Sequence, residues 1–527
     1  MFNNPKKMEG NVMNRFLKIV LLASMAVMLS TSVWAAEKNM VFASPYGITT
    51  FDPSVSYSTE LTYMANVYET LIKVNPPGSR ELFGYVLATG YSASDDGLEY
   101  TFNLRKGVKF HDGTLFNAAA VKFSIERTRK IGKGAAFIWS DIKEILVIDD
   151  YTVKFVLKTP VPLPQIAASA YASYIMSPAA ADKDQAWFDK GNDAGTGPYT
   201  IQNYKDGESW MLARFSDYWG GWEGRHVENI LVKYTKEPLI QMQMLQSGQA
   251  QLAGRIPIDS YKTFKESTTT KVLYGPSYQN YMAFFNTKRP PLDNVNVRKA
   301  LAHAIPYKDI ITIGFNEMAS QARGPIPNGQ FGATEAVFQY EENLELAKKL
   351  LAQAGFPGGG FKLTLTYAAE NGQEARFAPL IQSAFKKIGV DVEIKGLVWN
   401  TQWAMAKEGP EKAQDIFLLL WWPTYSDPYE TLYSLLHDEG DKPAWNLAYY
   451  QNKVYDDMIR KAYETTGSNP EKSLDLYVKA QNLIQEDAPA AWLVDVVGNW
   501  PMGEKLQGMV INPAYPNVPF FYELYIE

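Results

Sequence analysis

Apolar and polar residues alternate over several short stretches in the first half of the chain, which is the pattern of half-buried β-strands. Pairs of these stretches meet at Asp- and Gly-containing turns, around residues 95–97, 149–150 and 206–207. Such turns favour hairpins, so we expect antiparallel sheet in this half. Apolar residues that recur every three or four positions predict helices over residues 59–74 and 117–130, the second with Asn117 as N-cap.

The second half of the chain alternates between strand and helix patterns. Strands are predicted at 362–369, 390–397 and 415–422, and helices at 377–389 and 401–407 between them. A β-α-β-α-β order predicts a parallel sheet covered by helices, so the fold class is α/β.

The length of 527 residues is more than one hydrophobic core usually serves. The change of pattern predicts a first lobe over residues 36–276 and a second over 285–490, with residues 491–527 returning to the first lobe. Two chain segments then cross between the lobes, and this two-strand connection predicts a hinge that closes over a ligand.

The first 35 residues have the order of a secretory signal peptide. Basic residues precede an apolar run at 19–29, and small residues follow it up to Ala35 and Ala36, where we expect cleavage. Met13 is an alternative start. The apolar run is too short to span a bilayer comfortably.

Composition limits which cellular compartment and which binding partners are expected. The chain has no cysteine, so a lipoprotein anchor, disulfides and thiolate chemistry are not expected. Its net charge of −6 argues against nucleic acid and anionic lipid as partners. We expect a periplasmic monomer that is not anchored to the membrane.

Few residues are arranged for catalysis or metal binding. The four histidines show no metal-ligand spacing, and neither a nucleophile elbow nor a phosphate-binding loop is present. The run His437-Asp438-Glu439 is interpreted as a solvated loop, and Arg376 as a surface residue. We therefore predict no catalytic residue, no metal and no cofactor.

A longer motif is more specific than these short patterns. Residues 97–127 read GLEYTFNLRKGVKFHDGTLFNAAAVKFSIER, and four further blocks follow in order at 196–221, 284–305, 427–437 and 449–459. Together they resemble the extracellular solute-binding proteins of the dipeptide, oligopeptide and nickel group, family 5, which serve ABC importers. His111 falls in this motif and is expected to be structural.

The resemblance implies a two-lobed fold of the periplasmic-binding-protein type II kind, with an additional subdomain inserted in the first lobe at about residues 75–190. It also implies a function without catalysis. The protein would capture a small solute between its lobes and deliver it to an inner-membrane ABC permease.

The aromatic run WWPTYSDPY follows a predicted strand of the second lobe, at the carboxyl end where open α/β sheets bind ligands. Because neighbouring strand residues face opposite sides, we expect only one of Trp421 and Trp422 in the cleft. The predicted solute-binding residues are Trp421, Trp422, Thr424, Tyr425, Asp427, Trp399, Tyr57, Asn280 and Tyr281.

One position departs from the family pattern. Peptide-binding relatives carry an Asp four residues before the Pro of this block, where it pairs with the peptide ammonium, and here the residue is Thr424. Because a buried ammonium without a counter-charge is costly, ordinary α-peptides are disfavoured. A sugar, an opine-like compound or a modified peptide remains open as the solute.

Two other classes of function remain open at this point. An exported glycoside hydrolase would use aromatic platforms and two carboxylates. A chaperone or signalling receptor would use the same fold for another purpose.

Overall fold

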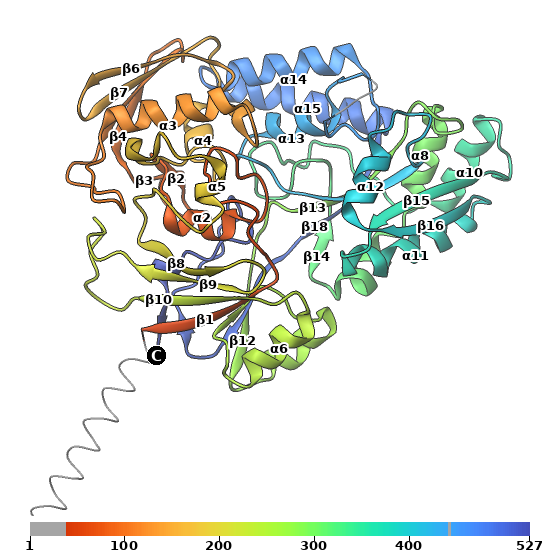
Figure 1. Ribbon diagram of the computed structural model, residues 1–527. Coiled ribbons are helices and arrows are strands. Elements are labelled where there is room, and N and C mark those ends of the chain that lie inside the picture. The colour runs from red at the N-terminus through yellow and green to blue at the C-terminus, as the bar shows by residue number, and fades with distance from the viewer. Residues whose placement is uncertain (1–37, 441–443) are drawn as a thin grey trace, which may run out of the picture.

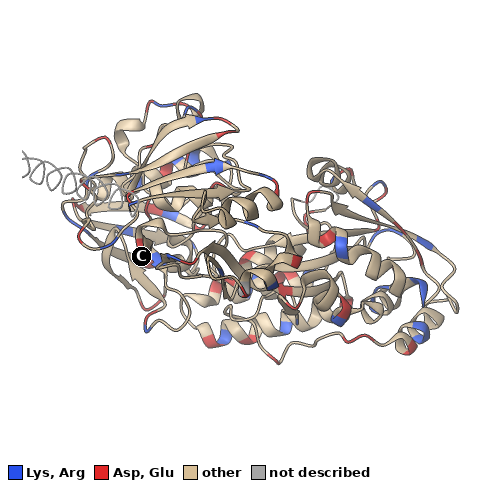
Figure 2. Cartoon of the chain, turned by 90° about the horizontal axis from the view of Figure 1, so that it is seen from below, with Lys and Arg blue, Asp and Glu red and all other residues tan. Residues whose placement is uncertain are grey.

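The computed structural model describes residues 38–440 and 444–527, so the predicted signal peptide lies outside the described residues. Figure 1 shows two lobes, one coloured mainly red to yellow-green and the other mainly green to blue. Figure 2 shows acidic and basic residues interspersed along both lobes, so the charged positions are not concentrated in one of them. In the part of the chain that is described, no helix combines the length and the apolar character needed to cross a membrane.

The first lobe is built on a seven-stranded sheet whose central strand is β1 (Asn39–Ser44). Strand β1 runs parallel to its two neighbours, β10 (Asn229–Tyr234) and β11 (Leu252–Ala253). Alternate residues of β10 are buried, as the sequence pattern predicts for a half-buried strand. Four further strands of this sheet pair with their neighbours in antiparallel fashion. They are β8 (Tyr199–Lys205), β9 (Ser209–Arg214), β12 (Thr270–Gly275) and β19 (Gly498–Gly503).

A four-stranded antiparallel sheet and one long helix form a subdomain within the first lobe. The helix α3 (Ala118–Ile131) begins as predicted, because the side chain of Asn117 accepts a hydrogen bond from the Ala120 amide. It ends at Gly132, whose φ of 63° is the left-handed conformation that glycine adopts at low cost. The strands, in spatial order, are β4 (Ala88–Ala93), β5 (Glu99–Leu104), β7 (Thr152–Leu157) and β6 (Ile142–Asp149).

The helix predicted over residues 59–74 is wrong beyond its first two turns. Helix α2 covers only Leu61–Val67, and Tyr68 is already extended. The β-branched residues that follow form β2 (Ile72–Val74), which pairs with β3 (Phe83–Tyr85). Tertiary pairing overrides the helical spacing here because Ile and Val fit a pleated surface well.

The second lobe is built on a six-stranded sheet in the order β14-β18-β13-β17-β15-β16. Its parallel part follows the predicted β-α-β-α-β order, since β15 pairs in parallel with both β16 and β17. The bounds of these strands are β13 (Asn280–Phe285), β14 (Ala319–Gln321), β15 (Lys362–Ala368), β16 (Asp391–Leu397), β17 (Ile416–Trp421) and β18 (Ala490–Val496).

Helices cover this second sheet and complete the lobe. Helix α11 (Gly372–Lys386) begins five residues before its predicted start, because the Asn371 side chain caps its first turn. The other helices near the sheet are α8 (Val295–Ala304), α10 (Leu344–Gln353) and α12 (Trp399–Ala406).

Three further helices of the second lobe lie against the subdomain of the first (Figure 1). They are α13 (Pro428–Leu436), α14 (Lys453–Thr466) and α15 (Pro470–Asp487). The Gly467 amide, between α14 and α15, donates to the Pro160 carbonyl at 3.1 Å. Arg460 lies 3.6 Å from Asp141 of the subdomain. The two lobes therefore touch along this side.

Two chain segments cross between the lobes, from β12 to β13 and from β18 to β19. They are hydrogen-bonded to each other: Ser277 Oγ donates to the Val496 carbonyl at 2.6 Å, and the Val496 amide donates to the Gln279 carbonyl at 2.9 Å. The crossings lie beside the carboxyl ends of β1, β11 and β17.

A buried ion pair in the first lobe generates a prediction about stability. Both guanidinium nitrogens of Arg127 lie 2.7 Å from the carboxylate oxygens of Asp52, which is 2% exposed. Replacing Arg127 by Met should lower the free energy of unfolding by about 3–5 kcal/mol, because it leaves a buried carboxylate without its cation. Urea denaturation measures this. Lys453→Met, which breaks an exposed ion pair, should leave the midpoint unchanged, and an equal loss in both variants would contradict the prediction.

Candidate functional site

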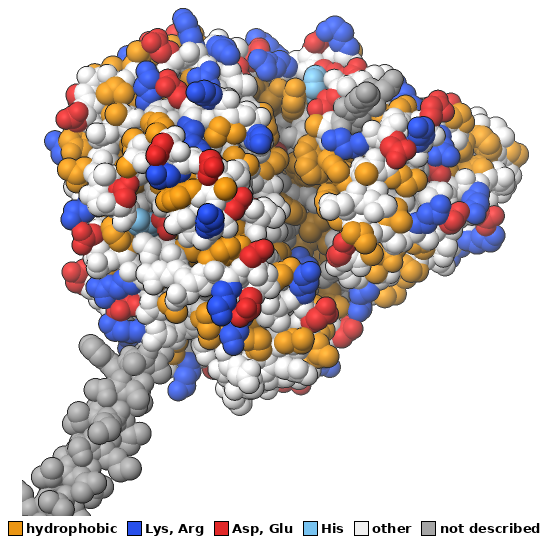
Figure 3. Space-filling model, in the orientation of Figure 1, with side chains coloured by type: hydrophobic (Ala, Val, Ile, Leu, Met, Phe, Trp, Pro, Cys, Tyr) orange, Lys and Arg blue, Asp and Glu red, His pale blue; other side chains and the backbone are white. Residues whose placement is uncertain are grey.

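Two neighbouring cavities lie between the lobes. Figure 3 shows a furrow there with orange, hydrophobic side chains along it. The first cavity has a volume of about 230 Å³ and the second about 460 Å³. Leu420 and Trp422 line both, so the two spaces are adjacent. They lie where parallel strands of both sheets end, the position at which α/β sheets hold ligands.

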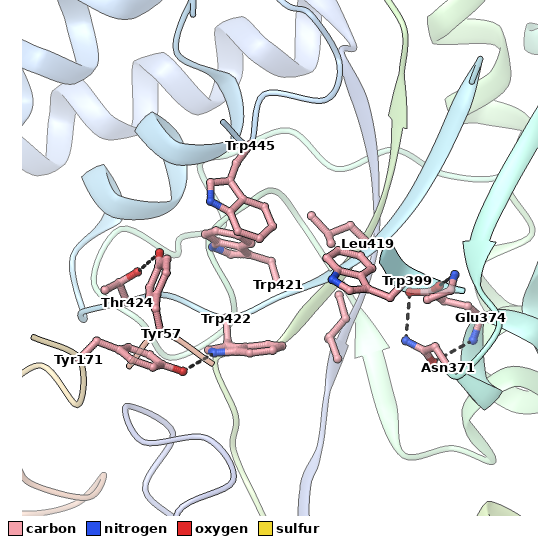
Figure 4. Close-up of a pocket in the computed structure, with 12 residues that line it drawn as sticks. Tyr57, Tyr171, Asn371, Glu374, Trp399, Leu419, Trp421, Trp422, Thr424 and Trp445 are labelled. Atoms are coloured by element: carbon pink, nitrogen blue, oxygen red, sulfur yellow. Dashed lines mark hydrogen bonds between the residues drawn. The ribbon is translucent and has the colours of Figure 1, made fainter. Parts of the chain in front are cut away.

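Indole rings form one wall of the first cavity. Trp421 and Trp445 have ring centroids 5.0 Å apart, and Trp403 lies 4.2 Å from Trp445 and 5.5 Å from Trp399. Figure 4 shows Trp445 directly above Trp421, with Trp399 beside them. Because these rings are already packed against one another, the apolar wall is formed before any solute arrives.

Both tryptophans of the aromatic run line this cavity, so the expectation that only one would do so is wrong. Trp421 is the last residue of β17, where it pairs with Asn280, whereas Trp422 lies beyond the last paired position. Strand alternation therefore no longer governs the direction of Trp422.

The first lobe contributes two tyrosines to the same cavity. The hydroxyl of Tyr57 lies 3.0 Å from Thr424 Oγ1, and the indole nitrogen of Trp422 donates to the Tyr171 hydroxyl at 3.2 Å. Both hydrogen bonds are drawn in Figure 4. Side chains of the two lobes thus meet around the cavity.

Thr424 does not offer a free polar group to the cavity. It is buried, and its hydroxyl donates to Glu430 Oε1 at 2.8 Å while also contacting Tyr57. Burial raises the pKa of Glu430 from 4.5 to about 7, although hydrogen bonds from Thr424 and Thr431 oppose this. A threonine that is bonded to a partly protonated acid balances the charge of a solute ammonium less well than a free carboxylate does.

The far end of the first cavity is polar. Glu374 accepts hydrogen bonds from the Ala368 amide at 2.9 Å and from the side-chain amide of Asn371 at 3.0 Å. Burial raises the pKa of Glu374 to about 8, with a smaller contribution in the same direction from Glu370. Glu374 is therefore largely neutral at pH 7 and presents an acid group without a full charge.

The second cavity has the chain crossings as its floor, and Tyr281 lines it. Arg376 also lines it and lies inside α11, whereas the helix predicted over residues 377–389 would begin just after it. Its guanidinium nitrogens lie 2.9 and 3.2 Å from the carboxylate oxygens of Asp259 in the first lobe. This ion pair bridges the lobes. Arg255, which the sequence analysis did not select, lines the same cavity.

Three of the predicted solute-binding residues are placed elsewhere. Asn280 is fully buried and donates to Asp495 and the Gly324 carbonyl. Asp427 is also fully buried, because it caps α13 and accepts from the Tyr477 hydroxyl. Tyr425 is buried too, and none of the three lines either cavity. The structure does bring Trp399, Trp421, Trp422, Thr424 and Tyr57 together.

Sequence reasoning missed Tyr171, Trp445, Asn371 and Glu374. Asn371 and Glu374 follow the carboxyl end of β15, so the rule that selected Trp399 would also have found them. Tyr171 and Trp445 lie on loops, and only the folded chain brings them to the cavity.

Two of the histidines are hydrogen-bonded to groups of the protein itself. His111 bonds through one ring nitrogen to Asp193 and through the other to the Gly197 carbonyl. His437 Nδ1 lies 3.0 Å from Asp456. Within residues 38–440 and 444–527, no three His, Cys, Asp or Glu side chains gather as a metal site would require.

The raised pKa of Glu374 predicts how stability depends on pH. The folded protein keeps this proton up to about pH 8, whereas the unfolded chain releases it near its ordinary pKa of 4.5. Between these values the folded state binds more protons, so its contribution to stability falls as the pH rises. The unfolding free energy of the parent should therefore fall between about pH 5 and 8, with a contribution from Glu374 of at most about 1.4 kcal/mol per pH unit. In Glu374→Gln this contribution is absent, so its unfolding free energy should fall less over the same range.

Denaturation of both proteins at several pH values measures this difference. Glu335→Gln, at an exposed acid, is the matched control and should leave the profile unchanged. Parallel profiles for the parent and Glu374→Gln would contradict the prediction.

Known proteins resemble the chain over most of its length. The model of bacterial extracellular solute-binding proteins, family 5, matches residues 83–443. A probable D,D-dipeptide-binding periplasmic protein of Escherichia coli is 29% identical over 89% of this chain and 90% of its own. A glutathione-binding protein of Pectobacterium atrosepticum is 29% identical over 93% and 94%.

Solved structures agree with the predicted two-lobed α/β fold. A periplasmic binding protein from Helicobacter pylori, in complex with the peptide STSA, superposes with a TM-score of 0.80 at 28% identity, over 93% of this chain and 98% of its own. A substrate-binding protein from Listeria monocytogenes gives a TM-score of 0.81 at 23% identity, over 93% and 99%. The fold prediction is thus confirmed. The chain belongs to family 5 of the bacterial extracellular solute-binding proteins, and its function is that of the solute-binding component of an ABC-type importer.

Proposed function

We propose that this protein holds a small solute in the two cavities between its lobes and passes it, chemically unchanged, to an inner-membrane permease. The observation that carries the proposal is the aromatic cavity to which both lobes contribute side chains. A solute there contacts Tyr57 of one lobe and Trp421 of the other, so binding favours the closed arrangement.

The size of the first cavity limits what it accepts. Its volume of about 230 Å³ exceeds that of an apolar cavity of about 150 Å³ that binds benzene. One ring or one branched apolar group fits, and the remainder of the solute extends past Trp422 into the larger cavity. The solute is therefore an amphiphile with an apolar end and a polar end.

The relatives named for D,D-dipeptides and glutathione support a peptide-like solute. Thr424 argues against a free ammonium at its position, because its hydroxyl already bonds to Glu430. An N-modified peptide or an opine-like compound meets both conditions. A sugar fits less well, because its hydroxyls need several hydrogen-bond partners and most polar groups that line the first cavity are already bonded within the protein.

The cellular setting is also part of the proposal. The Escherichia coli relative and the Helicobacter pylori protein are named as periplasmic, and residues 1–35 have the order of a cleavable signal peptide. The protein acts as a monomer in the periplasm and is not attached to the membrane.

A glycoside hydrolase is the alternative that aromatic platforms suggest. Such an enzyme needs two carboxyl groups flanking the scissile bond. Glu374 is the only acid among the described residues that line the first cavity, and it is already bonded to Asn371 and a backbone amide. Incubation of the protein with a solute library should yield no product beyond the amount of protein present, and turnover would refute the receptor function.

Replacement of one cavity wall tests the proposed site. Trp422→Ala should weaken solute binding by about 1–3 kcal/mol, because it removes a large apolar face from both cavities. Thermal-shift screening with dipeptides, N-acetylated peptides, glutathione, opines and sugars identifies binders, and calorimetry on the hits measures the loss. Trp187→Ala, at a partly buried tryptophan of the first lobe away from both cavities, is the control. Unchanged affinity in Trp422→Ala would remove this site from the proposal.

A further inference from the structure

Arg255 lies at the carboxyl end of β11, beside the carboxyl end of the parallel strand β1. Gly254 makes this position possible, because a Cβ there would meet the ring of Pro45 at 2.3 Å. Its amide also donates to the Ala43 carbonyl at 3.0 Å. The close approach brings Arg255 next to Tyr46 at the edge of the second cavity.

The backbone of Arg255 is fixed from inside the lobe. Its amide donates to the side-chain oxygen of Gln241 at 2.9 Å, and Gln241 is fully buried. The other end of the Gln241 amide donates to the Thr235 carbonyl at 2.7 Å. The arginine therefore projects from a rigid position and not from a free loop.

The guanidinium of Arg255 has no acidic partner among residues 38–440 and 444–527. One of its nitrogens donates to the Tyr46 hydroxyl at 3.4 Å, and its central carbon lies 5.4 Å from the centre of that ring. The groups that act on its charge are the phenols of Tyr46, Tyr281 and Tyr261. The side chain is open to water, so it keeps its charge and faces the cavity.

The other two charged side chains of the second cavity are already hydrogen-bonded to groups of the protein. The charged side chains that line it are Arg255, Glu370 and Arg376. Arg376 is paired with Asp259, and Glu370 accepts hydrogen bonds from the Trp399 amide at the start of α12. Among the described cations that line this cavity, Arg255 is thus the one without a carboxylate in contact.

We infer that Arg255 binds a carboxylate of the solute while the apolar end of the same molecule occupies the tryptophan-lined cavity. This deepens the proposed function and rests on it. The planar guanidinium offers two parallel N–H donors, which match the two oxygens of a carboxylate. A single arginine balances one negative charge, so a monocarboxylate end fits better than a phosphate dianion.

The expected solute is then an acid that carries no ammonium near Thr424. Trp422 lines both cavities and lies along the path between the two ends of the molecule. N-acylated peptides and opine-like acids have this chemistry. Their amides or esters would bind more weakly, because they cannot neutralise Arg255.

Matched acids and amides test the inference on the full-length protein. The panel contains N-acetylated dipeptides, D-alanyl-D-alanine, glutathione and mannopinic acid, each with the corresponding amide or ester. Calorimetry measures the affinity of every thermal-shift hit for the parent, Arg255→Gln, Trp422→Ala and Lys262→Gln. Lys262→Gln removes the same charge from an exposed side chain of the first lobe and is the matched control.

Arg255→Gln should lower the affinity for the acids by about 10- to 100-fold, because hydrogen bonds to charged groups are the stronger ones. Its affinity for the amides should equal that of the parent. Added salt should weaken acid binding to the parent more than to Arg255→Gln. Lys262→Gln should behave like the parent. Thermal melting without solute verifies that each variant is folded.

Three results would overturn the inference. The first is that the acids bind Arg255→Gln as tightly as they bind the parent. The second is that the amides bind the parent as tightly as the acids do. The third is that no acid in the panel raises the melting temperature of the parent. If Trp422→Ala loses affinity and Arg255→Gln does not, the cavity remains the binding site and only the carboxylate contact fails. If neither variant loses affinity for a solute that binds the parent, the proposed site fails as well.

Discussion

The hydrogen bonds between the two chain crossings are the constraint on which the binding region depends. Ser277 and Gln279 on one segment bond to Val496 on the other, so the crossings behave as a single narrow connection. Each crossing continues directly into strands of both sheets. The carboxyl ends of the parallel strands in the two lobes must therefore face each other across a short distance, and loops that follow these strands form both walls of the cavities.

The two cavities differ in character because different elements supply their walls. Indoles that follow β16 and β17, with Trp445 from a later loop, make the first cavity apolar. Loops after β1 and β11, together with the crossings, give the second one amides, phenols and charges. The rings of the first cavity have lost much of their rotational freedom during folding, so little entropy remains to be lost when a solute binds. Under the proposed function, solute selection then depends on which polar groups of the solute find hydrogen-bond partners in the second cavity.

Local sequence patterns were sufficient for the sheets but only partly for the cavities. The strands at β15, β16 and β17 were predictable because each is a short apolar run between helix patterns. Trp421 and Trp422 were recognisable because they follow such a run. Asp427 was misread as a solute contact, although an Asp directly before a Pro is also the signature of a helix start.

Arg255 and Trp445 could not have been selected, since their neighbours come from distant parts of the chain. The prediction of one helix over residues 59–74 was wrong for another reason. Their apolar spacing fits a helix throughout, and only the pairing of β2 with β3 shows where the helix gives way to strand. In each case, contacts between remote segments decide the outcome, and a window of ten or fifteen residues does not contain them.

The cavity-lining indoles of the first cavity also give the protein an internal optical reporter; they belong to Trp399, Trp421, Trp422 and Trp445. Four of its 13 tryptophans line one cavity, where a solute would displace water from their faces. Occupancy of that cavity is thus coupled to the ultraviolet emission of the native chain. Ligand capture and release by this protein can be followed in real time without attaching a dye.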